Sequence, residues 1–139
     1  MNPELTLTKV DAQPTRPAPT FAVRYSLEVP AYQELTLEDA SGVLAHWVIP
    51  QPIKQLAKRP GLLWLLSTMT PPDSLSCLET GPLQLAAAEP GTDSNLRAEL
   101  AQGMVRLAFS GQLLRGYYRL HCLPTGCGQL WQFTPISRV

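Results

Sequence analysis

The hydrophobic residues of the chain gather in short runs that are rich in β-branched and aromatic side chains, with glycine, proline and small polar residues between them. This pattern predicts β-strands joined by tight turns. In Met104–Phe109, large apolar residues alternate with Arg106 and Ala108, which is the period of a half-buried strand. The other runs that predict strands are Phe21–Leu27, Leu35–Leu37, Val43–Ile49, Leu83–Ala88, Leu113–Cys122 and Gln129–Ile136.

One further run, Leu62–Met69, is apolar without interruption and is followed by two prolines, so it predicts a buried strand. Between the runs, Asp39–Gly42 and Ser110–Gly111 have the composition of hairpin turns. Neighbouring strands are therefore expected to pair in antiparallel fashion.

Two short helices interrupt the strands. Ile53–Arg59 follows a proline at position 52 and stops before Pro60, which predicts a brief helix. Asn95–Gln102 is predicted as a helical turn or two, with Asp93 or Ser94 as its N-cap and Gly103 after its end.

The sequence therefore predicts a mainly β fold, a compact antiparallel β-barrel of about eight strands with one or two short helices. We assign residues 1–20 to a proline-rich N-terminal arm and residues 21–139 to a single barrel domain. The expected core includes Trp47, Leu63, Leu65, Val105, Leu107, Phe109, Leu120, Trp131 and Phe133.

Composition narrows the function classes. Eleven basic residues balance eleven acidic ones, so no strong positive field attracts nucleic acid or an anionic membrane. No apolar stretch approaches the ~18 residues of a membrane-spanning helix, and the first twenty residues lack the apolar core of a secretory signal. With an odd number of cysteines, three, the sequence fits a cytoplasmic protein without a disulfide framework.

Few residues are candidates for acid–base or metal chemistry. His46 lies on a predicted strand with no partner nearby in sequence, so a structural role is favoured over that of a catalytic base. His121, Cys122 and Cys127 have donor types that suit zinc, but their spacing matches no zinc motif. We therefore favour a hairpin with buried thiols at these positions.

Four arginines could share one surface, and an ordinary solvated face is favoured over a nucleic-acid groove because the net charge is zero. They are Arg24, Arg106, Arg115 and Arg119.

Several segments in order resemble one family. Phe21–Glu38 (FAVRYSLEVPAYQELTLE) and Gly42–Pro50 (GVLAHWVIP) are similar to the FVVxxHxxxxLHYDxRLE and DGVLxSWAVPKG motifs of the N-terminal 3′-phosphoesterase domain of bacterial DNA ligase D. Gly103–Gly116 (GMVRLAFSGQLLRG), with the YYRL strand after it, resembles that family's G-x-L-x-F-x-L-x-G-x-x-L-x-G segment. Gln129–Trp131 matches its terminal strand, so the likeness extends from Phe21 to Phe133.

The resemblance implies a small β-barrel and manganese-dependent removal of 3′ phosphates and ribonucleosides from DNA ends. The residues that align with the metal ligands differ, however. The family's first two metal-binding histidines fall on Ser26 and Tyr32, and its aspartate falls on Glu34. The third histidine falls on Thr70. Hydroxyl side chains are poor ligands at neutral pH, so the resemblance implies that the manganese ligands are not retained.

The positions that contact phosphate in the family also lack their charge. Its arginine falls on Thr36 and its lysine on Gln51. The segment after Pro71 is about ten residues shorter than in the family, so this side of the site is remodelled. The matching positions surround one cavity in the family, and the binding residues expected to converge here are Ser26, Tyr32, Glu34, Thr36, Gln51 and Thr70.

The leading hypothesis is a catalytically degenerate relative of this domain, with a non-enzymatic binding or assembly role, no catalytic residue and no metal or other cofactor. One alternative is a residual or altered 3′-phosphoesterase that uses Glu34 with His46 or His121. Another is a non-catalytic module that binds DNA ends. We expect weak DNA binding and no membrane association, and a protein partner stays open. Because Glu34 adds negative charge, the site should prefer a neutral or cationic partner to phosphate.

Overall fold

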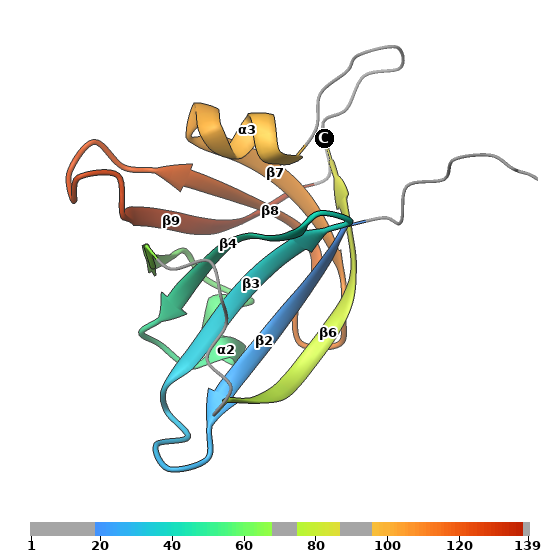
Figure 1. The fold of residues 1–139 in the computed structure, drawn as a ribbon, viewed down its shortest axis with the longest axis vertical. Coiled ribbons are helices and arrows are strands. Elements are labelled where there is room, and N and C mark those ends of the chain that lie inside the picture. Colours follow the sequence, from blue (N-terminus) through green and yellow to red (C-terminus); the bar gives the residue numbers. More distant parts are fainter. Residues whose placement is uncertain (1–18, 68–74, 87–95, 138–139) are drawn as a thin grey trace, which may run out of the picture.

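The strands of the barrel pair in the order β2–β3–β4–β5–β9–β8–β7–β6, and β6 closes the ring by pairing with β2 (Figure 1). All pairs in this ring are antiparallel. The computed structural model describes residues 19–67, 75–86 and 96–137. Within them the eight strands are β2 (Thr20–Ser26), β3 (Gln33–Asp39), β4 (Gly42–Ile49), β5 (Gly61–Leu65), β6 (Leu75–Leu85), β7 (Met104–Ser110), β8 (Arg115–Cys122) and β9 (Leu130–Ile136).

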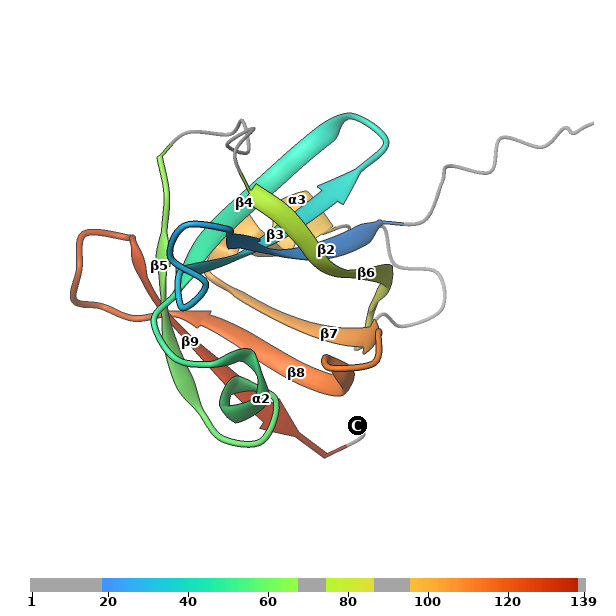
Figure 2. The ribbon, with the colours of Figure 1, turned by 90° about the horizontal axis from the view of Figure 1, so that it is seen from below.

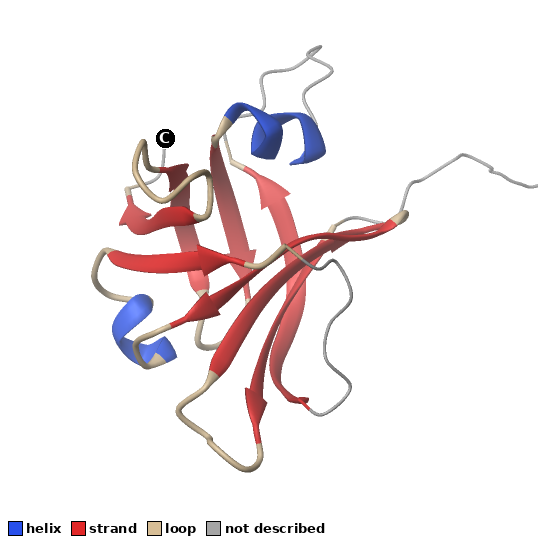
Figure 3. Ribbon diagram, turned by 60° about the vertical axis from the view of Figure 1, so that its left-hand side comes forward, coloured by secondary structure: helices blue, strands red, loops and turns tan. Residues whose placement is uncertain are grey.

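The two helices lie at opposite ends of the barrel (Figures 1 and 2). α2 (Ile53–Leu56) buries Ile53 and Leu56, and the hydroxyl of Tyr118 on β8 donates a hydrogen bond of 3.0 Å to the carbonyl of Ala57 just after it. α3 (Leu96–Gln102) precedes β7, and Figure 3 shows both helices against the ring of strands. Gly103, with a φ of 87°, ends α3 in the conformation that glycine adopts readily.

Alternation along the strands fills the interior with aromatic and aliphatic side chains. Phe109 lies at the centre, with ring centroids 4.9 Å from Phe21, 5.4 Å from Tyr118 and 5.7 Å from Phe133. Eight of the nine expected core residues are fully buried, and Leu65 is partly buried. Aromatic edge-to-face pairs of this kind contribute about 0.5–1.5 kcal/mol each beyond the burial of their area.

A single carboxylate organises the turn between β7 and β8. Glu79 of β6 accepts hydrogen bonds of 2.7 to 2.9 Å from the backbone N–H groups of Gln112, Leu113 and Leu114. Gly111 is needed beside it, because a Cβ there would lie 2.7 Å from the Phe21 ring. These contacts join β6 to the β7–β8 hairpin, where the ladder between β6 and β7 has only three residue pairs.

The predicted elements agree with the structure in number and type, with two differences in the strands. Leu62–Met69 was predicted as a buried strand, but β5 ends at Leu65, and the side chains of Leu62 and Trp64 are 44% and 42% exposed on the outer face. β6 begins at Leu75, well before the predicted Leu83, because its first half buries no side chain and pairs with β2 through its backbone. Where a strand is exposed on one face, a continuous apolar run overstates its burial, and the lack of such a run hides the strand.

The helices differ from prediction mainly in length. α2 ends at Leu56 rather than Arg59, and position 52 is its N-cap rather than its first helical residue. The proposed caps of α3, Asp93 and Ser94, lie outside the described residues, as does the arm up to residue 18. Among the described residues, no helix is long and apolar enough to cross a membrane.

Candidate functional site

The outer face of β3 is polar but buried. Leu35 and Leu37 point into the barrel, so the alternating residues Glu34 and Thr36 point outward. Even so, Glu34 is 1% exposed and Thr36 is fully buried. On the neighbouring strand, His46 is directly opposite Thr36 in the register and is also fully buried. Buried polar groups of this kind are normally held by hydrogen bonds or opposite charges.

Glu34 lies between a phenol and an imidazole. The hydroxyl of Tyr32 donates a hydrogen bond of 2.5 Å to Oε2 of Glu34. The other oxygen, Oε1, lies 3.5 Å from Nδ1 of His46. Tyr32 comes from the start of the β3 segment and His46 from the middle of β4, so both oxygens of the carboxylate face a neighbour that the fold supplies.

These contacts determine the state of Tyr32. Desolvation, the hydrogen bond to Glu34 and the negative charge of Glu34 together raise the pKa of Tyr32 from 10.0 to about 12. A phenol is protonated at neutral pH even at the ordinary pKa of 10.0, and the raised pKa of Tyr32 extends this donor state to strongly alkaline pH. A phenol in this state is neither a nucleophile nor an anionic metal ligand.

Thr36 is bonded to Arg24 of β2, the strand that pairs with β3 on the edge away from β4. Nη1 of Arg24 donates a hydrogen bond of 3.2 Å to the Thr36 hydroxyl, and Nη2 of the same side chain lies 3.7 Å from Oε2 of Glu38. The guanidinium thus links two residues of β3 on its outer face, a buried hydroxyl and a partly exposed carboxylate. This ordering of Arg24 was not apparent from the sequence, in which Arg24 and Thr36 are separated by 12 residues.

The structure brings some, but not all, of the expected site residues together. Ser26 ends β2, where its N–H donates to the Tyr32 carbonyl at 3.1 Å and its hydroxyl accepts from the Val29 N–H at 3.1 Å. Ser26 therefore fixes the turn that carries Tyr32. The Gln51 side chain packs beside Gly61 at the start of β5, so it supports the end of the barrel that carries α2. Thr70 lies outside the described residues.

His46, which the sequence offered as a partner of Glu34 only in the alternative hypothesis, is fully buried against that carboxylate. A structural role was favoured because no partner is near it in sequence, yet the β3–β4 register places it against Glu34. The only available signal was the period of two in both strands, which does not give the register. His121 lies on β8, four strands from β3 in the ring, and so belongs to a different part of the surface.

The proposed zinc donors do not converge. Among the described residues, no group of three or more histidine, cysteine, aspartate or glutamate side chains could hold a metal ion. The expectation of buried thiols is also wrong at Cys127, which is exposed, whereas Cys122 is half-buried. Cys127 has a φ of 55° in the loop before β9, where the turn rather than the core determines its position.

The four arginines do not form a single surface. Arg106 and Arg119 are directly opposite each other on β7 and β8, and Arg115 lies at the beginning of β8. Arg24, by contrast, lies on β2 and is engaged by Thr36 and Glu38. Two cations in cross-strand positions are unfavourable unless an anion or solvent lies between them. Both side chains are half-buried, and the Nε of Arg119 is buried, so this pair is only partly solvated.

No family model and no curated protein matches this chain. The geometry of the site determines what it can do chemically. That geometry places the Tyr32 phenol, the Glu34 carboxylate and the His46 imidazole in contact in that order. The guanidinium of Arg24 lies beside them, bonded to Thr36. In this arrangement the Tyr32 hydroxyl donates to Glu34, and the imidazole of His46 lies against the other oxygen of the carboxylate.

Proposed function

We propose that this chain is a catalytically inactive relative of the DNA ligase D 3′-phosphoesterase domain, with a binding or assembly role. The observation that carries the proposal is the contact of Tyr32 and His46 with the two oxygens of Glu34. In the family that the sequence resembles, the matching carboxylate helps to hold manganese. Here the fold itself provides Glu34 with a donor on one side and an imidazole on the other.

The donor set that the described residues provide does not fit the metal that the resemblance implies. Manganese needs several anionic or neutral oxygen and nitrogen donors that converge on one point. The Tyr32 phenol is held protonated, the Ser26 hydroxyl is bonded within its turn, and Thr36 is bonded to the cationic Arg24. A guanidinium beside the site also repels a divalent cation. These described residues therefore do not form a manganese site.

Recognition of a phosphate is weakened by the same substitutions. Thr36 and Gln51 are neutral where the family uses cationic side chains, and Glu34 adds negative charge. Arg24 lies close to Thr36, but its guanidinium is shared with Glu38. Electrostatic stabilisation of a phosphoryl transition state needs cations directed at the phosphate oxygens. This balance of charge favours a neutral or cationic partner.

The activity test uses a DNA duplex with a 3′ phosphate and added manganese. We expect no phosphate release above a control without protein, and no manganese in the protein as purified. Turnover that disappears in Glu34→Ala and persists in the matched control Glu99→Ala, on α3, contradicts the proposal. The control changes a carboxylate on the first turn of α3, well away from β3.

A second candidate function rests on the Glu34–His46 contact. A buried carboxylate 3.5 Å from an imidazole can orient that imidazole as a general base. This arrangement favours an altered phosphoesterase that works without a metal. Its test is phosphate release in the presence of a chelator, compared between the wild type and His46→Gln. Chelator-resistant release that depends on His46 supports this candidate and excludes the inactive one.

The alternative of a non-catalytic module that binds DNA ends is tested by measuring binding alone. We expect the labelled 3′-phosphate duplex to bind with a dissociation constant of about 10⁻⁴ M or weaker at physiological salt, which is the non-specific range. The titration is repeated at a second salt concentration. Sub-micromolar binding that is weakened by Tyr32→Ala, but not by a mutation at Arg115, shows instead that phosphate recognition persists on β3.

A further inference from the structure

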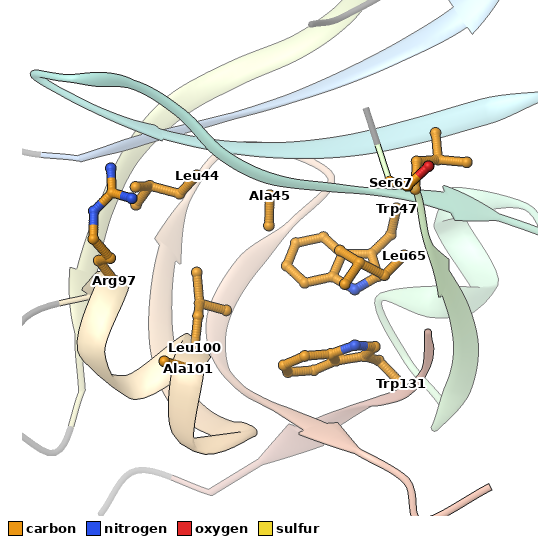
Figure 4. A pocket seen from close by; sticks show the side chains of 10 residues that line it. Leu44, Ala45, Trp47, Leu65, Ser67, Arg97, Leu100, Ala101 and Trp131 are labelled. Atoms are coloured by element: carbon orange, nitrogen blue, oxygen red, sulfur yellow. The ribbon is translucent and has the colours of Figure 1, made fainter. Parts of the chain in front are cut away.

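A cavity lies on the opposite side of β4 from the polar face. β5 pairs with β4 only at Trp47 and Val48, and the chain is bonded to β4 once more where the Leu66 N–H donates to the His46 carbonyl at 2.9 Å. Within the described residues, therefore, no strand pairs with the first half of β4 on this edge. α3 lies across the opening instead (Figure 4). β5 is shorter than β4, and a space remains between β4 and α3.

The walls of this cavity are mainly apolar, and two of them are indoles. Figure 4 shows Trp47 and Trp131 on one side and Leu100 and Ala101 of α3 on the other, with Ala45 above. The indoles contact each other edge to face, with centroids 5.6 Å apart. The Nε1–H of Trp131 donates to the Gly128 carbonyl at 3.1 Å, so its ring is fixed in place. These walls are preorganised, which lowers the cost of binding.

The size of the cavity sets the size of its ligand. Its volume is about 360 Å³. A dry apolar cavity of about 150 Å³ holds one benzene molecule, so this one has room for about two aromatic rings. Small-molecule sites typically begin at about 300 Å³ and commonly occupy the mouths of β-barrels. Flat aromatic walls on one side favour a flat aromatic guest.

The rim of the cavity carries one cation. Arg97 of α3 lies at the end nearest Leu44, and its Nη2 donates a hydrogen bond of 3.0 Å to the hydroxyl of Ser41. The Ser41 hydroxyl in turn donates to Oδ1 of Asp39 at 2.6 Å. This chain of contacts orients the guanidinium and partly offsets its charge. A guanidinium has five N–H groups, so it can still receive a carboxylate at the rim.

We propose that this cavity binds a small two-ring aromatic carboxylate, with its rings between the two indoles and α3 and its carboxylate at Arg97. Most of the affinity comes from the rings, because exposed ion pairs add little. The site is separated from Glu34 by the wall of the barrel, so it does not depend on the proposed function. Either proposal can fail while the other stands.

The test is a calorimetric titration of the whole chain with 2-naphthoate, and with 2-naphthylmethanol as the uncharged comparator. We expect saturable binding of 2-naphthoate with a dissociation constant of about 10⁻⁴ M or tighter, as the size of the probe allows. Ala101→Trp fills the space and should weaken both probes at least tenfold. Gln102→Trp is the matched control, because it is exposed on the same helix and does not line the cavity.

The charge is tested by Arg97→Gln. We expect about threefold weaker binding of 2-naphthoate and unchanged binding of the alcohol, in line with an exposed ion pair. A nuclear magnetic resonance titration locates the probe without any variant. The indole N–H signals of Trp47 and Trp131 should shift, while that of the outward-facing Trp64 should not. Absence of saturable binding, equal binding in the Ala101→Trp and Gln102→Trp variants, or a shift of Trp64 alone overturns the proposal.

Discussion

His46 and Trp47 are neighbours in sequence and both are fully buried, but they belong to different environments. The alternation of β4 places His46 on the outer face, against Glu34, and Trp47 on the inner side, against Trp131. On the outer face, polar side chains bond to one another across three strands. On the inner side, apolar walls surround a space of about 360 Å³.

The polar outer face around Glu34 is therefore less prepared to bind a ligand than the apolar cavity on the inner side. The donors and acceptors of the outer face contact one another. The inner side carries little chemistry, yet it has room and rigid walls. Binding in such a molecule is expected where groups are ordered and space remains, rather than where polar residues are most concentrated.

The largest loss of stability should follow from removing a side chain that lines the inner cavity. Trp47→Ala removes a fully buried indole and is expected to lower the free energy of unfolding by about 3–5 kcal/mol. Trp64→Ala, at a residue that is 42% exposed, is the matched control and should cost about 1 kcal/mol or less. Denaturant unfolding measures both variants. Equal losses for the two tryptophans contradict the placement of Trp47 in the core.

A smaller loss of stability is expected from substitutions on the outer face. Glu34→Ala leaves the Tyr32 hydroxyl and the His46 imidazole beside a gap, at a cost of about 2 kcal/mol for buried polar groups that lose their partner. Glu38→Ala on the same strand removes only a half-exposed ion pair of 3.7 Å and should cost about 0.5 kcal/mol or less. Urea unfolding compares the two. A neutral Glu34→Ala shows that the carboxylate is solvated rather than engaged.

The Tyr32–Glu34 contact can be isolated by a double-mutant cycle. Tyr32→Phe and Glu34→Gln are combined, and the coupling energy between them is expected to be about 1 kcal/mol, because the bond joins a donor to a charged acceptor at a partly exposed site. The readout is the midpoint of chemical unfolding in the four proteins. Additive effects of the two substitutions indicate that the phenol and the carboxylate do not interact in solution.

The smallest effect depends on pH. Because the pKa of Tyr32 is raised from 10.0 to about 12 in the folded chain, the unfolded chain loses this proton first. The stability that Tyr32 contributes is therefore complete below pH 10 and is lost as the pH rises from 10 towards 12. Burial also raises the pKa of Tyr118, so the measurement is the difference between the wild type and Tyr32→Phe. A difference in absorbance between the two proteins that develops around pH 10, or identical alkaline stability profiles, contradicts the shift.

Much of the barrel could be predicted from the sequence, because side-chain alternation and turn residues are local. Both predicted hairpins are present, as is the glycine stop after α3. β6 was largely missed because its first half contributes backbone pairing rather than buried side chains. Leu62 and Trp64 were misjudged because an apolar run does not reveal which of its residues face outward.

The candidate site was less predictable. The resemblance singled out Tyr32 and Glu34, and the structure joins them by a hydrogen bond. The contributions of His46 and Arg24 depend on the register between strands, which periodicity does not specify. The inner cavity depends on the difference in length between β4 and β5 and on the position of α3. These are properties of the assembled barrel.

A manganese titration of isotope-labelled protein, followed by nuclear magnetic resonance, tests the central claim most directly, because the paramagnetic ion broadens the signals of residues close to it. The account predicts that, at equimolar manganese, the amide signals of Tyr32, Glu34 and His46 broaden no more than those of His121 on the opposite side of the barrel. Selective broadening around Glu34 that is abolished by Glu34→Ala contradicts the account, because it shows that the outer face still binds the metal.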